Sequence, residues 1–264
     1  MDATMAPKVE LSPIGYFRSP QVRPYEAGRQ PDEFHSSGYI ELQGGKNFEQ
    51  ALTGLEGCER IWVIFLFHHN DHWNPMVLPP RGSQKKLGVF ATRSPYRPNP
   101  VGMSCVKVRS IEKLKIHVEG ADLLDGSPIL DIKPYVAYAD SFPEVEPAWL
   151  KDAEKFTIEF SPPAQKQLDW LELHQLQQLR GFLQHQLEFE PDNARKKRVK
   201  PNANGFVIAY RTWRAQFEIQ DQHVRVIRIF SGYSKEDLNS PEDTYGDKDL
   251  HRRFQMAFPD ISQT

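Results

Sequence analysis

The chain reads Arg60-Ile61-Trp62-Val63-Ile64-Phe65-Leu66-Phe67-His68 in its first third, an unbroken apolar run between two polar residues. β-branched and aromatic residues dominate the run, and these residue types favour a strand. A strand with one solvent-exposed face alternates apolar and polar residues, whereas this run is apolar on both faces. We therefore expect a strand covered by a barrel interior on one side and by another layer or subunit on the other.

More short strands are expected on either side of this run, because Gly, Pro, Asn and Asp clusters separate several short apolar segments. The candidate strands are Leu11–Phe17, Gly38–Leu42, Arg60–His68, Gly88–Thr92, Met103–Ser110, Lys115–Gly120 and Ile129–Ile132. Helical periodicity is nearly absent from this part of the chain. A mainly β fold, a barrel or a sandwich, is predicted for it.

The remaining sequence predicts a smaller α+β part. Ser161 before two prolines is typical of a helix start, and leucines from Leu168 to Leu187 follow at near-helical spacing. Two strand-like runs, Phe206–Ile219 and Val224–Phe230, then flank a hairpin turn. We expect a domain at residues 8–150, a second at 156–235 and a polar, partly ordered tail at 236–264.

Composition limits the class of protein. With 39% hydrophobic and 26% charged residues, the chain is typical of soluble globular proteins, and it has neither a long apolar span nor a signal peptide. We expect a cytoplasmic protein that binds no membrane, with Cys58 and Cys105 as buried free thiols. The net charge of −2 argues against whole-molecule attraction to nucleic acid, although a local basic patch would not show in that total.

Several common catalytic motifs are missing from the sequence. It contains no Walker A loop, no G-x-G-x-x-G after a strand, no H-E-x-x-H, no paired C-x-x-C and no G-x-S-x-G. These absences argue against ordinary nucleotide hydrolysis, Rossmann dehydrogenation and zinc peptidase chemistry.

The most polar segment, Ala91–Gly102, contains three prolines that stiffen a loop. Arg93 and Arg97 in this loop suit an anionic ligand, because a guanidinium can hold a carboxylate or phosphate through two hydrogen bonds. Tyr96 and Asn99 are further candidate contacts to a substrate. The alternative is a stiff exposed turn whose arginines pair with local acids.

A second candidate segment is Asp122-Leu123-Leu124-Asp125-Gly126-Ser127-Pro128. Its last four residues are typical of a turn, which is the simpler interpretation. The two carboxylates could instead face a ligand's amine while the leucines cover an apolar ring.

Two further clusters have competing interpretations. The segment His68-His69-Asn70-Asp71-His72 fits either a metal site or, as we favour, a polar strand end with a histidine that titrates near neutral pH. The run Arg195–Lys200 holds five basic residues in six positions. Such runs are often solvated loops, yet this one could neutralise phosphates together with the arginines of the predicted hairpin.

Several motifs together resemble the TsaA-like family over roughly residues 8 to 150. They are Ile14–Pro20, Gly28–Pro31, Gly54–Gly57, Phe67-His68-His69, Gly88–Ser94, Arg97–Gly102, Leu124–Pro128 and Asp131–Tyr135. The resemblance implies a single-sheeted β-barrel that binds S-adenosylmethionine, commonly as a homodimer. It also implies methylation of N6 in threonylcarbamoyladenosine at position 37 of tRNA, next to the anticodon.

Residues are carried over from the family only where the motifs match. The implied cofactor-binding residues are Gly28, Arg29, Gln30, His68, His69, Arg93, Met103, Asp122, Leu123, Leu124 and Asp125. Asp125 and His68 are also the candidate catalytic residues, because a urea nitrogen attacks poorly and needs an acceptor for its proton. Arg97, Tyr96, Asn99 and Lys133 are the candidate substrate-binding residues.

Two other classes of function remain open on the sequence alone. One is a non-catalytic module that binds S-adenosylmethionine or RNA. The other is a metal-dependent hydrolase built on His68, His69, Asp71 and His72, although we expect no metal.

Overall fold

The computed structural model describes residues 9–21, 37–151, 154–176 and 178–259. They form two compact units. The first comprises the chain up to Pro79 together with Gln84–Val145, and the second comprises Pro80–Ser83 together with the chain from Glu146 onward.

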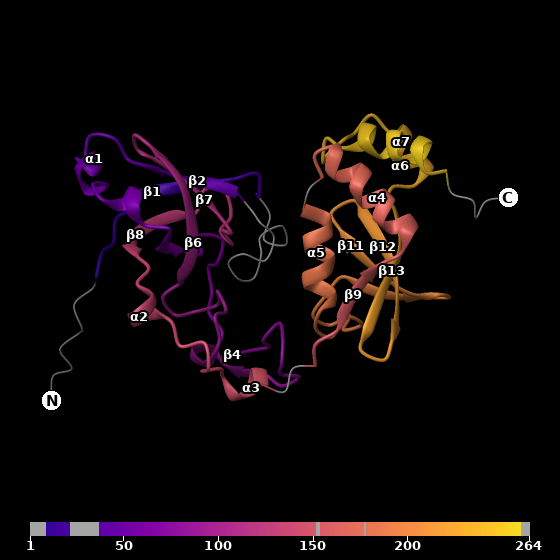
Figure 1. Cartoon of the computed structure of the whole chain (residues 1–264), viewed down its shortest axis with the longest axis horizontal. Helices are drawn as coiled ribbons and strands as arrows, with labels where there is room; N and C mark the ends of the chain where they lie inside the picture. The colour runs from indigo at the N-terminus through magenta and orange to yellow at the C-terminus, as the bar shows by residue number, and fades with distance from the viewer. Residues whose placement is uncertain (1–8, 22–36, 152–153, 177, 260–264) are drawn as a thin grey trace. The chain divides into compact units, whose positions relative to one another are not determined.

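Six antiparallel strands of the first unit close into a barrel in the order β1-β2-β7-β6-β3-β8 (Figure 1). They are β1 (Gly15–Arg18), β2 (Ser37–Leu42), β3 (Arg60–Leu66), β6 (Val101–Glu112), β7 (Lys115–Glu119) and β8 (Pro128–Pro134). This confirms the predicted mainly β fold with an N-terminal barrel.

Side chains of the apolar run in β3 lie on both sides of the barrel wall. Ile61, Val63 and Phe65 are buried in the interior. The intervening Trp62, Ile64 and Leu66 face outward and remain half-buried in the single chain. Gly102 of β6 pairs with Phe65, and a Cβ there would lie 2.4 Å from the phenyl ring. Only glycine therefore lets this ring fill the barrel next to β6.

Short elements complete the first unit. They are α1 (Phe48–Ala51), η1 (Leu55–Gly57), β4 (Met76–Val77), β5 (Leu87–Gly88), η2 (Val89–Ala91) and α2 (Ala137–Asp140). The predicted strand at Gly88–Thr92 is wrong, because β5 ends at Gly88 and the chain turns into η2. The Thr92 hydroxyl and amide both donate to the Val89 carbonyl oxygen, which closes the turn.

The cysteines differ from expectation in their exposure. Cys58 and Cys105 are free thiols as expected, but both are half-exposed rather than buried. Cys58 precedes β3 and Cys105 lies on the outward side of β6, opposite Trp62.

The second unit is a five-stranded sheet with helices. The sheet order is β10-β11-β12-β13-β9, with β9 parallel to β13 and the other pairs antiparallel. The strands are β9 (Thr157–Phe160), β10 (Val199–Asn202), β11 (Gly205–Tyr210), β12 (Trp213–Gln220) and β13 (His223–Ser231). The helices are α3 (Ala148–Lys151), α4 (Pro162–Leu173), α5 (Gln178–Leu187), α6 (Lys235–Asn239) and α7 (Lys248–Ala257). The Ser161 hydroxyl accepts the Ala164 amide at 3.2 Å, which confirms the predicted helix start.

The chain beyond Ser231 is more structured than its polar sequence indicates. A capping box between Ser234 and Asp237 starts α6. In α7, His251 is fully buried, stacks on Trp213 at 3.8 Å between ring centroids, and bonds to Ser231 and Thr212. The buried face of α7 therefore includes polar side chains held by hydrogen bonds, and the segment for which we expected a partly ordered tail contains the helices α6 and α7.

Candidate active site

Residues far apart in the sequence meet at one end of the barrel. Gly126 N–H donates to the Phe17 carbonyl at 2.8 Å, and Asp125 N–H donates to the Gln21 carbonyl at 2.8 Å. The Asp125 carboxylate in turn accepts the Ser19 amide at 3.0 Å. The chain after β1 and the chain before β8 thus form one rim, and Asp125 is part of its backbone framework.

His68 follows β3 and reaches the same rim. Its Nδ1 lies 3.5 Å from the Ser127 hydroxyl. Its ring lies 4.0 Å from that of His69. Burial and the neighbouring His69 hold the pKa of His68 below its usual value, opposed by a hydrogen bond to the Leu66 carbonyl and by the charge of Asp125. The imidazole is therefore neutral at pH 7 and can accept a proton beside a carboxylate.

Asp122 extends the rim into the barrel. It accepts a hydrogen bond from the hydroxyl of Ser104, which is buried on the inward side of β6. Leu123 is buried in the barrel core and Leu124 is half-buried. The structure thus brings His68, Asp122 and Asp125 to the same end of the barrel, with apolar side chains between the carboxylates.

The proline-rich segment joins the rim through its last residues, since Phe67 N–H donates to the Pro100 carbonyl at 2.8 Å. Arg97 does not project freely from it. Its guanidinium donates to the carbonyls of Val89 (3.2 Å) and Thr92 (2.9 Å) and lies over the Phe90 ring. Arg97 therefore holds the loop in shape.

Other residues of this segment face outward. Arg93 and Asn99 are exposed. Tyr96 packs against His72 at 5.2 Å between ring centroids.

Two predicted site residues lie on the outer wall of the barrel. Met103 is 54% exposed and pairs with Ile64 of β3. Lys133 forms an ion pair with Asp131 at 2.8 Å, and lies roughly 16 Å along β8 from Pro128 at the usual strand rise. Within one chain, Lys133 is not brought to the rim. Gly28, Arg29 and Gln30 lie outside the described residues.

The histidine cluster does not assemble a metal site. Among the residues that the structure describes, no group of three or more His, Cys, Asp or Glu side chains could hold a metal ion. His72 pairs instead with its neighbour Asp71 at 2.7 Å. The metal-dependent hydrolase therefore gains no support.

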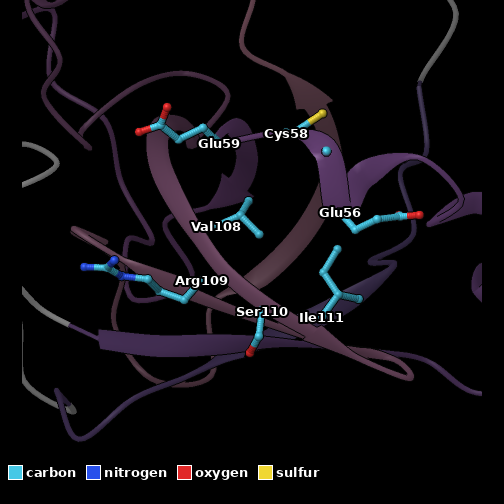
Figure 2. Close-up of a pocket in the computed structure, with 8 residues that line it drawn as sticks. Glu56, Cys58, Glu59, Val108, Arg109, Ser110 and Ile111 are labelled. Carbon is cyan, nitrogen blue, oxygen red and sulfur yellow. The ribbon is translucent and has the colours of Figure 1, made fainter.

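A pocket of about 300 Å³ lies at the other end of β3 and β6, between Glu56–Glu59 and Val108–Ile111 (Figure 2). Figure 2 shows Val108 and Ile111 at its centre, with the Arg109 guanidinium pointing away. Arg109 forms an ion pair with Glu119. The pocket contains none of the predicted site residues, so we place the candidate site at the rim.

Three rim residues were not predicted from the sequence. They are Gln21, Ser104 and Ser127. Ser127 lies in a turn motif and Ser104 in an ordinary strand, so neither has a sequence signal of its own. Gln21 is 2% exposed, and in the described part of the chain neither atom of its side-chain amide has a hydrogen-bond partner. A buried amide without partners marks a place where a ligand can bind.

Known proteins resemble this chain in sequence and in fold. Residues 16–141 match the family described as the tRNA-methyltransferase O N-terminal domain. The tRNA (adenine(37)-N6)-methyltransferase of Escherichia coli (strain K12) is 33% identical over 226 residues, which cover 80% of this chain and 96% of that protein. The chain belongs to the tRNA-methyltransferase O family.

Other members of the tRNA-methyltransferase O family match as well. A Pseudomonas aeruginosa protein named "Putative S-adenosylmethionine-dependent methyltransferase RcsF" is 40% identical over 163 residues, 60% of this chain and 70% of its own length. A crystal structure of TrmO from P. aeruginosa has a TM-score of 0.60 and 29% identity, and covers 87% of this chain and 100% of that one. In the described ranges, no helix is long and apolar enough to span a membrane.

Proposed function

We propose that this protein methylates N6 of adenine 37 in tRNA, in its threonylcarbamoylated form, with S-adenosylmethionine as the methyl donor. Family membership and the name of the E. coli relative support the reaction. The name of the P. aeruginosa relative supports the donor. The observation in this chain that carries the proposal is the meeting of His68 and Asp125 at one barrel end.

The residues at the rim fit S-adenosylmethionine chemically. Its sulfonium and amine are cationic, and Asp122 and Asp125 offer carboxylates. Its adenine needs apolar cover and hydrogen bonds to its edge, and Leu124 and the buried amide of Gln21 offer these. The resemblance also assigns Gly28, Arg29, Gln30 and His69 to this cofactor site. Exposed Arg93 and Met103 would reach it only across a contact with a second subunit, and the buried Leu123 would support it from the barrel core. When bound, the cofactor supplies an electrophilic methyl group.

The protein's own groups orient the reaction and accept a proton. As the bond from N6 to the methyl carbon forms and the carbon–sulfur bond breaks, N6 must lose its proton. Neutral His68 or the Asp125 carboxylate accepts it, which contributes about 10²–10⁴-fold to the rate. The rigid rim holds the two reactants in line, which supplies a further large factor.

The anionic groups of the substrate need cations near the rim. Exposed Arg93 suits the threonyl carboxylate or a phosphate. Tyr96 and Asn99, on the same segment, are proposed to contact the anticodon loop. Arg97 supports them by shaping the loop, and Lys133 requires a second subunit to reach a substrate.

We further propose a cytoplasmic homodimer. Trp62, Ile64 and Leu66 face outward from β3 beside the exposed Met103 of β6. Such an apolar wall favours contact with a second copy. Light scattering on the purified protein should give twice the chain mass, and Ile64→Lys should give the mass of one chain.

The deciding experiment is mass spectrometry of nucleosides from tRNA incubated with protein and S-adenosylmethionine. Threonylcarbamoyladenosine should gain one methyl group. Transcripts that lack the threonylcarbamoyl group should gain none. A non-catalytic S-adenosylmethionine- or RNA-binding module would bind both components and leave every nucleoside unmethylated, which would overturn the proposal.

A further inference from the structure

The sheet of the second unit has two chemically different faces. One face packs against helices, since Trp213 of β12 contacts His251 and Phe254 of α7 and Tyr210 of β11 contacts Phe182 of α5. In Figure 1, α5 runs along one side of this sheet. Residues next to Trp213 and Tyr210 in the strands point the other way, because side chains alternate along a strand.

The strand register groups cations on this second face. Arg198 accepts the Ala209 amide through its carbonyl at 3.0 Å, Ala209 pairs with Arg214, and Arg214 pairs with Phe230. One row therefore runs from Arg198 across β11 and β12 to Phe230 on β13. In the next row, Lys200 pairs with Val207, Val207 with Gln216, and Gln216 with Arg228. We call Arg198, Lys200, Arg214 and Arg228 the basic face.

The arginines of the basic face are held in position. The Arg214 guanidinium donates to the carbonyls of Arg211 (3.2 Å) and Trp213 (2.8 Å). The Arg228 guanidinium donates to the Gln216 side chain at 2.9 Å and lies 5.0 Å over the Phe230 ring. Groups that are ordered beforehand lose less entropy when they bind a ligand.

Like charges converge on this face. Burial and the charge of Arg198 both lower the pKa of Arg214. Ala209, which separates the two arginines in the row, has only a methyl side chain. An anion that approaches over Ala209 would meet both guanidinium groups and relieve their repulsion.

The basic face has a clear limit toward the β12–β13 hairpin. There Arg225 lies in register between Glu218 and Glu159, so acidic side chains outnumber the cation. The neighbouring run Arg195–Lys200 contributes less positive charge to the basic face than its sequence indicates. Lys196 bonds to Glu190 and the Ser83 carbonyl, and Lys197 bonds to the carbonyls of Gln186 and Phe189 at the end of α5. These two lysines stabilise the second unit itself.

We propose that the basic face binds the phosphodiester backbone of tRNA, so that the second unit holds the substrate while the barrel rim performs the chemistry. The inference rests on the proposed function, which identifies the bound polyanion as tRNA. The chain as a whole carries a net charge of −2, so a local cluster of cations is what can attract RNA. Guanidinium groups suit phosphates because they can donate two hydrogen bonds to one phosphate group.

The test compares two double variants of the full-length protein that remove equal charge. Arg198→Gln with Arg228→Gln alters the basic face. Lys166→Gln with Arg253→Gln alters exposed cations on α4 and α7. The Kd for an unmodified tRNA transcript is measured by fluorescence anisotropy at several salt concentrations. The basic-face variant should bind about 10-fold more weakly, with a slope of log Kd against log salt reduced by about 1.5.

The control pair should bind tRNA as the wild type does, and both variants should keep the wild-type affinity for S-adenosylmethionine and remain folded at the assay temperature. An unchanged Kd for the basic-face variant overturns the inference, as does an equal loss in the control pair. Methyl transfer by the wild type is measured separately. Its absence would overturn the proposed function, whereas the salt-dependent binding result decides the basic face by itself.

Discussion

The Ser19 amide donates a 3.0 Å hydrogen bond to the Asp125 carboxylate across 106 residues of sequence. The same carboxylate contributes to the electrostatic environment of His68. One side chain therefore ties the chain after β1 to the chain before β8 and also faces the candidate proton acceptor. Substitutions of Asp125 can therefore separate its effect on stability from its effect on the reaction.

Asp125→Asn removes the charge of Asp125 but keeps an oxygen that can accept the Ser19 amide. We expect kcat for methyl transfer to fall by about 10²-fold or more. The free energy of unfolding should change by less than about 1 kcal/mol. Asp125→Ala, which also removes the acceptor, should destabilise by a further ~1 kcal/mol or more in urea titrations. A wild-type kcat in the Asp125→Asn variant would show that this carboxylate takes no part in the reaction.

The pH dependence of kcat should report on His68. Because burial and His69 lower its pKa, neutral imidazole is present at pH 7, and kcat should stay flat above that pKa and fall as pH drops through it. The free energy of unfolding should depend on pH in the same direction as kcat. The folded chain binds this proton less readily than the unfolded chain, so the contribution is present above the unfolded pKa of about 6.5 and is lost in more acid solution.

His68→Asn should abolish this acid limb together with most of the rate, while His72→Asn, at a more exposed ring that pairs with Asp71, should leave the profile unchanged. A His68→Asn enzyme that keeps the wild-type acid limb would assign that limb to another group.

Arg97→Ala and Arg93→Ala should separate the support of the loop from contact with the substrate. Arg97 donates to the Val89 and Thr92 carbonyls, so its loss should lower the free energy of unfolding by about 2 kcal/mol. Arg93→Ala should leave stability within about 0.5 kcal/mol and raise the KM for tRNA, since Arg93 is exposed. Equal stability of the two variants in urea would show that Arg97 does not hold the loop.

Local patterns predicted much of the fold. The strands from Gly38 to Ile132 follow the expected segments closely, apart from Gly88–Thr92, and the helix start at Ser161 and the turn between β12 and β13 also match. The expected run Phe206–Ile219 is instead two strands, β11 and β12, joined by a turn. Strand and helix-cap signals depend on neighbouring residues, so they can be recognised without tertiary structure. The helices α6 and α7 were missed because their segment is polar on average: α6 has only five residues, and the buried face of α7 contains Lys248 and His251 beside Phe254.

The amino-acid sequence alone was sufficient for the mainly β class and, through its motifs, for the family and its barrel. Tertiary structure decided which of the candidate side chains lie together and which stabilise the protein: His68 and Asp125 converge on one rim, Arg97 binds its own loop, and Lys196 and Lys197 bind carbonyls of their own unit. The physical reason is that a charged side chain binds the nearest partner that compensates its desolvation, and distant segments supply that partner only when the chain is folded.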